Sequence, residues 1–230
     1  MTTNKKTRAF EVGASQKLHQ LWERNWARDN FAPSWVISEI PKEVQDAVAS
    51  EWFAPGTSLL DIGCGSGELA AWLAERGFNV LGVDFSESAI EKARASAGRA
   101  QKPNQLLFKV ADMCFDAAPS PQFNALIDRG CLQGLPKSMQ ANYVKTVASW
   151  ALPGAHFLLI FGFGQGGRRA MQEEKARRQQ TRAHLEMLFR PLFEIIKMEP
   201  TFLERHPPHD FVPAVAVWMV RRGLQGNAGR

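Results

Sequence analysis

Apolar runs alternate with amphipathic segments along most of this 230-residue chain. The apolar runs predict strands near residues 58–62, 79–83, 105–110, 123–128 and 155–162. Helical spacing of apolar residues between them predicts helices near residues 67–76, 86–96 and 137–150. This alternation is typical of an α/β protein, in which helices flank a parallel sheet on both faces.

The C-terminal third departs from this alternation. A long charged helix is expected over about residues 168–189, followed by strands over 192–199 and 212–220. Their short connection predicts an antiparallel hairpin. In the helix predicted over residues 86–96, Ser86 is the expected N-cap.

A glycine-rich turn follows the first predicted strand. Gly63, Gly65 and Gly67 lie between that strand and a helix start. Glycines allow backbone to contact a ligand, since no Cβ intervenes, and the helix start offers free backbone N–H groups. The next apolar strand ends at Asp84, 21 residues after Gly63. An acid at about this distance binds the ribose hydroxyls in dinucleotide-binding units, so the pattern predicts a nucleoside-containing ligand.

Three segments together resemble the cofactor motifs of class I S-adenosylmethionine-dependent methyltransferases. They cover residues 61–67, 83–86 and 111–113. The resemblance spans about residues 57–162 and implies a Rossmann-like, seven-stranded, mostly parallel sheet whose last strand is antiparallel, with S-adenosyl-L-methionine as cofactor. The alternatives are an NAD-binding unit or a turn without a ligand. The NAD fingerprint requires G-x-G-x-x-G, whereas this turn has G-x-G-x-G.

The same resemblance implies roles for individual residues. In the family, the glycine turn passes under the methionine part of the cofactor. The acid after the second strand, here Asp84, binds the ribose, and the acid after the third, here Asp112, binds the adenine amino group. The cofactor-binding residues implied in this chain are Trp22, Trp26, Trp35, Asp61, Gly63, Cys64, Gly65, Gly67, Asp84, Phe85, Asp112, Met113, Asp128 and Arg129.

The segment after the fourth strand indicates one branch of this family. Asp128, Arg129 and Gly130, followed by a small residue and Leu132, resemble the thiopurine, thiol and halide methyltransferase branch. This resemblance implies that Arg129 contacts the cofactor region. A guanidinium pairs well with a carboxylate such as that of a methionine moiety. A structural pair with Asp128, or a surface arginine, is the alternative.

Tryptophans ahead of the core support the same branch. Trp22 and Trp26 are spaced i,i+4 and share a helix face, and Trp35 follows after a polar gap. In that branch such tryptophans form a lid, and an aromatic face suits a sulfonium charge. Packing of an amphipathic helix is the alternative. We therefore expect a helical lid segment over residues 1–56, a methyltransferase domain over 57–222 and a disordered tail over 223–230.

Composition changes this interpretation little. Lys and Arg number 28 against 23 Asp and Glu, a net charge of +5. No apolar run approaches the ~20 residues of a membrane span, and the basic N-terminus is followed by no apolar signal core. Three cysteines give neither a disulfide framework nor metal-ligand spacing. We expect a cytoplasmic protein that binds no metal and no membrane.

The basic excess gathers in residues 166–182. This segment is either a solvated helix face or a mobile gate that attracts an anionic substrate. It is also the only feature that favours a nucleic-acid methyltransferase. Against that alternative, no Asn-Pro-Pro-Tyr type motif follows the fourth strand, so no nucleic-acid partner is expected.

The loop before the last strand contains His206 and His209, the candidate catalytic residues. Either would remove a proton from an acceptor, since histidine titrates near neutral pH. A solvated turn, or a metal site with Asp210, is the alternative. The sequence thus predicts a methyltransferase acting by in-line transfer on a small-molecule thiol, nitrogen or oxygen nucleophile; a non-catalytic cofactor-binding protein is the remaining alternative.

Overall fold

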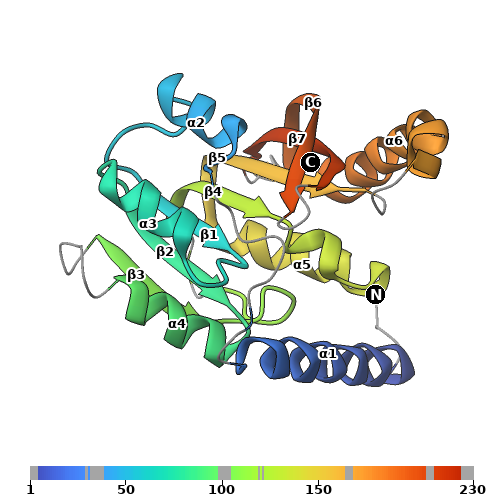
Figure 1. Cartoon of the computed structure of the whole chain (residues 1–230), viewed down its shortest axis with the longest axis horizontal. Helices are drawn as coiled ribbons and strands as arrows, with labels where there is room; N and C mark the ends of the chain where they lie inside the picture. The colour runs from blue at the N-terminus through green and yellow to red at the C-terminus, as the bar shows by residue number, and fades with distance from the viewer. Residues whose placement is uncertain are drawn as a thin grey trace, which may run out of the picture.

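The chain forms a seven-stranded sheet with strand order β3-β2-β1-β4-β5-β7-β6 (Figure 1). The computed structural model describes residues 5–28, 31, 39–97, 105–118, 120, 122–163, 168–205 and 210–223, without the side chains of residues 5–12, 14, 168–176, 205 and 210. The strands are β1 (Ser58–Ile62), β2 (Asn79–Asp84), β3 (Leu106–Val110), β4 (Phe123–Arg129), β5 (Ala151–Gly162), β6 (Phe193–Arg205) and β7 (Asp210–Arg221).

Strand direction follows the predicted pattern. Strands β1 to β5 pair with one another in parallel, and β7 pairs antiparallel with both β5 and β6. Strand β6 therefore runs with the parallel set, and β7 alone runs against it. This confirms the Rossmann-like sheet with an antiparallel last strand. It also places the carboxyl ends of β1 to β6 at one edge, where ligands bind in open sheets of this kind.

Helices cover both faces of the sheet (Figure 1). They are α1 (Lys5–Trp26), α2 (Lys42–Ala49), α3 (Glu68–Glu75), α4 (Glu87–Ala97), α5 (Lys137–Trp150) and α6 (Arg168–Phe189), with a short 3-10 turn η1 (Leu132–Gly134). Helices α2, α3 and α4 contribute to the core on one face, and α5 and α6 to the core on the other. Helix α1 lies beside α4 at the edge of the molecule.

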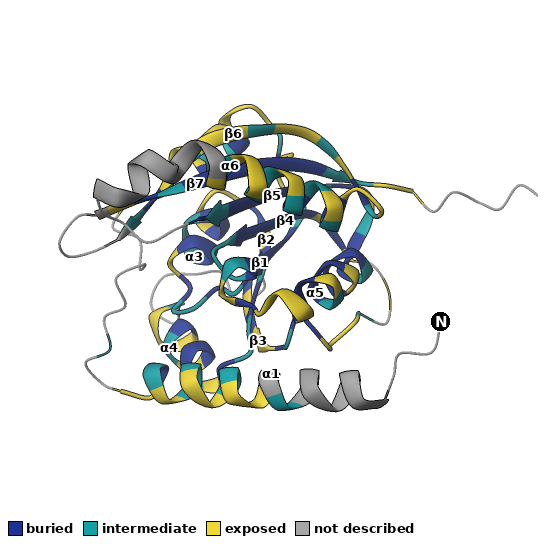
Figure 2. Ribbon diagram, turned by 90° about the vertical axis from the view of Figure 1, so that its right-hand side faces the viewer, coloured by how far each residue is buried: buried dark blue, intermediate teal, exposed yellow. Residues whose placement is uncertain are grey.

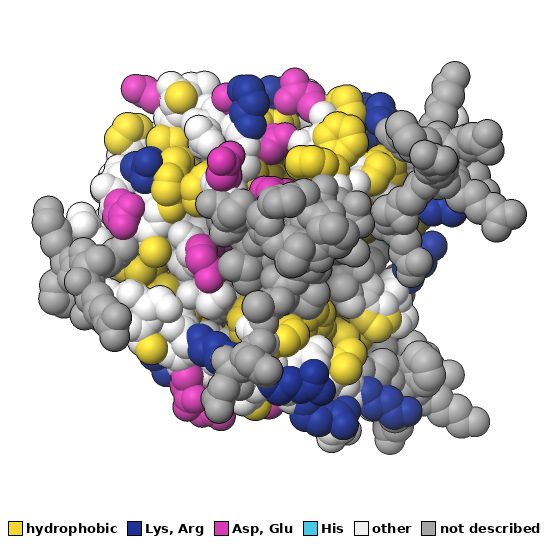
Figure 3. All heavy atoms as spheres, in the orientation of Figure 1, with side chains coloured by type: hydrophobic (Ala, Val, Ile, Leu, Met, Phe, Trp, Pro, Cys, Tyr) yellow, Lys and Arg dark blue, Asp and Glu magenta, His cyan; other side chains and the backbone are white. Residues whose placement is uncertain are grey.

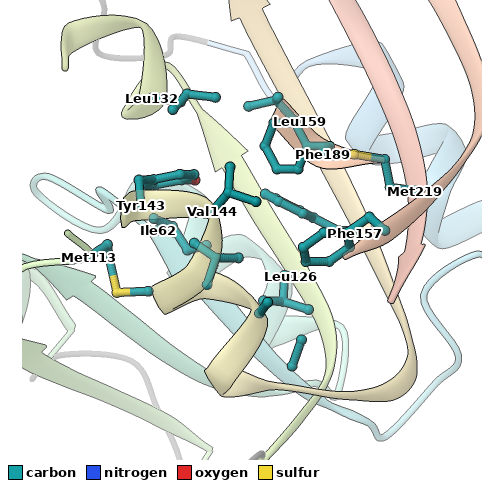
Figure 4. Packing of buried hydrophobic residues seen from close by; sticks show 14 of the residues in the cluster. Ile62, Met113, Leu126, Leu132, Tyr143, Val144, Phe157, Leu159, Phe189 and Met219 are labelled. Carbon is teal, nitrogen blue, oxygen red and sulfur yellow. The ribbon is translucent and has the colours of Figure 1, made fainter. Parts of the chain in front are cut away.

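The larger core lies between the sheet and helices α5 and α6. Figure 4 shows Tyr143 and Val144 of α5 above Ile62 and Leu126 of the sheet. In Figure 2, the dark blue of buried residues runs through the central strands. Each large apolar side chain buried in this way contributes about 1.5–3 kcal/mol. The apolar runs of the sequence are thus explained by burial on both faces.

Element boundaries differ from the predicted ones mainly in the last three strands. Strand β5 begins at Ala151, and β6 continues to Arg205 because the hairpin with β7 is paired over its whole length. Strand β6 contains Pro200, which is tolerated because β6 lies at the edge of the sheet. The predicted N-cap is confirmed, since the backbone N–H of Ala89 donates to Ser86 Oγ at 3.2 Å.

Among the helices in the described part of the chain, none has both the length and the apolar character needed to cross a membrane. Of the predicted C-terminal tail, residues 224–230 lie outside the described ranges.

Candidate functional site

A cavity opens at the carboxyl edge of the sheet. It is lined by the segments that follow β1, β2, β3 and β4 and by helix α1. The predicted cofactor-binding residues that line it are Trp22, Trp26, Asp61, Gly63, Cys64, Gly65, Asp84, Phe85, Asp112, Met113 and Arg129. Residues separated by up to about half the chain are therefore brought together at one site, as the strand order requires.

The glycine turn approaches its neighbours too closely for side chains. Gly63, Gly65 and Gly67 have φ angles of 68°, 54° and 87°, in the region that favours glycine. A Cβ at Gly63 would lie 2.6 Å from Cys131 Cβ, and one at Gly65 would lie 3.1 Å from the Trp26 ring. Gly67 is the N-cap of α3 and does not itself line the cavity. The turn thus offers bare backbone to the cavity at a helix start.

Asp84 is fixed by backbone donors. Its Oδ2 accepts the N–H of Gly65 at 3.1 Å, and its Oδ1 accepts the N–H of Ser86 at 2.9 Å. Burial raises the pKa of this carboxyl, and these hydrogen bonds oppose the rise. A carboxylate has about four acceptor positions, so this one retains capacity for donors in the cavity. A pair of ribose hydroxyls fits that capacity.

Asp61 is a buried acid with an unused oxygen. Its side chain is 3% exposed, and its Oδ2 has no hydrogen-bond partner within the described chain. Burial, followed by the charges of Asp128, Glu68 and Asp84, raises its pKa to about 8. An unpaired buried carboxylate is costly, whereas a cation beside it would remove the cost. The α-ammonium group of a methionine moiety is such a cation.

We predict that Asp61→Asn stabilises the ligand-free chain at pH 8. The folded pKa of about 8 lies above the ordinary value of 3.8, so the folded state binds the proton more tightly than the unfolded state. This stabilisation is complete below about pH 4 and is lost as the pH rises toward 8. Asparagine does not ionise, so the gain should be about 3–5 kcal/mol at pH 8 and about 1–2 kcal/mol at pH 5.

Thermal unfolding of both chains at pH 5 and pH 8 measures this difference. The same variant should bind S-adenosylhomocysteine more weakly, because the charge that would face the ammonium group is gone. A gain of equal size at both pH values would mean that ionisation of Asp61 does not cost stability.

Arg129 reaches the cavity from the end of β4. Burial lowers the pKa of its guanidinium to about 10, while the charges of Glu204, Glu43 and Asp61 oppose that change. Its Nη2 lies 3.5 Å from the carbonyl oxygen of Glu204. Arg129 therefore remains a cation at neutral pH, held between the cavity and the end of β6.

Asp128 was predicted to bind the cofactor, but the structure places it away from the cavity. It is fully buried and does not line the cavity. Its carboxylate accepts the backbone N–H groups of Cys131 and Leu132 at 2.8 and 3.0 Å and the hydroxyl of Tyr143. The strand alternates its side chains, so Asp128 points into the core while Arg129 points to the cavity. Asp128 thus positions the loop after β4.

Helix α1 contributes one side of the cavity. Leu18, Trp22 and Trp26 line it, and Trp26 is only 5% exposed. The helix is fixed to the start of α4, because Glu23 accepts the Ser86 hydroxyl at 2.7 Å and the hydroxyl of Ser88. Burial alone would raise the pKa of Glu23, but hydrogen bonds from Ser88 and Ser86 outweigh it and lower the pKa. The predicted shared face of the two tryptophans is confirmed.

Sequence reasoning missed two residues of α1 at this site. His19 Nε2 lies 2.7 Å from Asp112 Oδ2, and the Ser15 hydroxyl donates to the same oxygen at 3.2 Å. A signal was present in the spacing. His19 is three residues before Trp22 and seven before Trp26, on the same helix stripe. The spacing does not predict that His19 pairs with Asp112, because the two residues are 93 positions apart in the sequence.

Several predicted features fall outside the described residues. They include Trp35 and the candidate catalytic residues His206 and His209. Among the described residues, no group of three His, Cys, Asp or Glu side chains is arranged to hold a metal ion. The roles of Trp35, His206 and His209 therefore stay predictions.

The side chains of the basic segment are described from residue 177 onward. Arg177 is exposed, and Arg182 donates to the carbonyl of Met198 at 3.0 Å, so part of the segment packs on β6. On the face shown in Figure 3, Asp and Glu side chains lie mainly in the upper part, and several Lys and Arg side chains lie along the lower edge.

Comparison with known proteins also indicates a methyltransferase. The sequence profile of a family described as thiopurine S-methyltransferase matches residues 18–165. The chain is 28% identical over 128 residues to 2-heptyl-1-hydroxyquinolin-4(1H)-one methyltransferase of Mycobacteroides abscessus, a match that covers 56% of this chain and 55% of that protein. It is 29% identical over 160 residues to a thiopurine S-methyltransferase of Azotobacter vinelandii, covering 62% and 71%. The chain thus spans little more than half the length of the first relative.

Solved structures show the same fold. A protein solved in a study of the conversion of a disulfide bond into a thioacetal group during echinomycin biosynthesis has a TM-score of 0.72 and 22% identity, over 89% of this chain and 93% of that one. The N-methyltransferase NodS from Bradyrhizobium japonicum, solved with S-adenosylhomocysteine, has a TM-score of 0.63 and 14% identity, over 90% and 99%. At these identities the likeness concerns the fold alone.

Proposed function

The chain belongs to the thiopurine S-methyltransferase family of S-adenosylmethionine-dependent enzymes, and from this premise we propose that it methylates a small-molecule acceptor. The observation that carries the proposal is the cavity itself. It combines the bare glycine turn with three acids, Asp61, Asp84 and Asp112, each within two residues of the end of a different strand. The family membership agrees with the branch that the sequence predicted.

The residues present fit the cofactor. The unused oxygen of Asp61 suits an ammonium group, and the remaining acceptor positions of Asp84 suit ribose hydroxyls. Arg129 supplies a cation for the methionine carboxylate. Without Cβ atoms, Gly63 and Gly65 pack directly against Cys131 and Trp26 and present backbone to the cavity that they line.

When bound, S-adenosylmethionine supplies a methyl group already activated on a sulfonium. The protein then has to align the acceptor with that methyl group and exclude water. Trp22 and Trp26 cover the cavity from α1, and Leu135 and Met113 add apolar surface. Aromatic faces beside the sulfonium also stabilise its positive charge.

We propose an acceptor whose thiol or hydroxyl ionises near neutral pH. No histidine lines the cavity within the described part of the chain. An acceptor that is already anionic needs no base, and the charge of Arg129 would favour its anionic form. The names of the relatives, a thiopurine and a hydroxyquinolone methyltransferase, agree with such acceptors. For a less acidic acceptor, His206 or His209 is the proposed base.

Calorimetry with S-adenosylhomocysteine and with NAD tests the cofactor assignment, and only the first ligand should release heat. Transfer of a labelled methyl group to a thiopurine, to a 1-hydroxyquinolone and to RNA then tests the acceptor class. We expect label on at least one of the small molecules and none on RNA. Binding of NAD alone, or label on RNA alone, would overturn the proposal.

We further propose that the N-terminal segment acts as a lid. Helix α1 contributes three residues to the cavity lining, and polar contacts with Ser86 and Asp112 hold it to the core. Of its described side chains only Ser15 and Trp26 are buried. S-adenosylhomocysteine should therefore increase the hydrogen-exchange protection of residues 13–28. Helix α2, none of whose residues lines the cavity, serves as the internal control and should change little. Equal protection of α1 with and without ligand would mean that α1 only packs on the core.

A further inference from the structure

The carboxylate of Asp112 is held from two directions. Its Oδ1 accepts the backbone N–H of Cys114 at 2.7 Å, and its Oδ2 accepts from His19 and Ser15 of helix α1. Two of the three donors therefore come from a helix that precedes the methyltransferase core in sequence. Asp112 also lines the cavity.

The number of acceptor positions limits what Asp112 can bind next. A carboxylate accepts at about four positions, and donors of the protein occupy at least three of them. Burial by itself raises the pKa of Asp112, but the hydrogen bonds from His19, Cys114 and Ser15 outweigh it and lower the pKa. Asp112 is thus ionised at neutral pH and acts only as an acceptor, so the ligand atom that faces it must carry a hydrogen.

His19 is itself fixed by packing. Its ring stacks on Phe85, with ring centroids 4.4 Å apart and an interplanar angle of 11°. Phe85 lines the cavity directly after Asp84. One side chain of α1 therefore touches both the segment after β2 and the acid after β3. A shift of α1 would change the direction of the Asp112 carboxylate.

We propose that His19 is a positioning residue that determines nucleobase specificity, by holding Asp112 as an acceptor for the amino group of the cofactor's adenine. The proposal rests on the proposed use of S-adenosylmethionine. It assigns to α1 a part of base recognition as well as the covering of the cavity. A base with a carbonyl oxygen in place of the amino group would face the ionised Asp112 with an acceptor and be rejected.

The test compares two ligands that differ at that position, S-adenosylhomocysteine and its deaminated analogue S-inosylhomocysteine. The wild-type chain should prefer the first, and calorimetry gives the ratio of the two dissociation constants. In His19→Ala the carboxylate loses one of its donors, and the ratio should fall by about tenfold. His19→Gln should restore most of it, because the glutamine amide retains an N–H donor near the position of Nε2.

Glu23→Gln is the matched control. Glu23 lies on the same helix and holds α1 to Ser86 and Ser88, without contact to Asp112. This variant should weaken both ligands alike and leave their ratio unchanged. If His19→Ala also leaves the ratio unchanged while the wild type prefers adenine, the inference is wrong and the proposed function stands. If the wild type binds neither ligand, the proposed function fails as well.

Discussion

Replacing Asp84 with asparagine is expected to weaken binding of S-adenosylhomocysteine by about 10- to 100-fold, which corresponds to about 1.5–3 kcal/mol. The carboxylate accepts the N–H groups of Gly65 and Ser86, one on each oxygen. An asparagine side chain offers an acceptor to only one of them, and its NH2 group opposes the other. The variant loses the charge that would bind the ribose hydroxyls and also the support of the glycine turn.

Calorimetry measures the change, and Asp46→Asn is the control. Asp46 is a half-exposed acid of α2 whose carboxylate pairs with Lys42 on the surface. Its replacement also removes one negative charge, so a general effect of net charge would appear in both variants. Affinity of Asp84→Asn within twofold of the wild type would remove the cofactor role from this residue.

The second large effect is expected from Gly63→Ala. The residue has a φ angle of 68°, where an alanine costs about 1–2 kcal/mol. Its Cβ would also lie 2.6 Å from Cys131 Cβ, and such overpacking adds about 1–3 kcal/mol. We expect a destabilisation of about 2–5 kcal/mol in urea unfolding. Binding of S-adenosylhomocysteine should be lost, because the turn can no longer approach the loop after β4.

Gly77→Ala separates the two causes. Gly77 has a φ angle of 88°, but a Cβ there would meet no atom within 4 Å. This control therefore carries the backbone strain without the collision. It should cost only about 1–2 kcal/mol and leave ligand binding intact. Equal losses in the two variants would show that the contact with Cys131 relaxes freely.

The roles of Asp128 and Arg129 show how one residue step changes an interpretation. The two residues are neighbours in one motif, and the sequence analysis assigned both to the cofactor region. In the folded strand they point to opposite faces, so Asp128 is buried with Tyr143 and Arg129 reaches the cavity. The motif alone does not show which of the two side chains points to the cavity, because that depends on how the strand is placed in the sheet.

The sequence by itself determined the sheet, its helices and the position of the site. These features depend on local patterns. Apolar runs mark strands that are buried on both faces, and a turn with positive φ angles requires glycines. Because the carboxyl ends of parallel strands share one edge, Asp61, Asp84 and Asp112 were expected to meet there, and they do.

Only the tertiary structure decided how these acids are held. Asp112 receives its donors from Ser15 and His19, and Glu23 reaches Ser86 across 63 residues of sequence. No local pattern encodes such contacts, because they depend on where α1 lies against the sheet edge and α4. The burial that leaves Asp61 with an unused oxygen is likewise a property of the packed molecule. Spacing therefore identifies the residues of the site, and packing determines their hydrogen bonds and their charge.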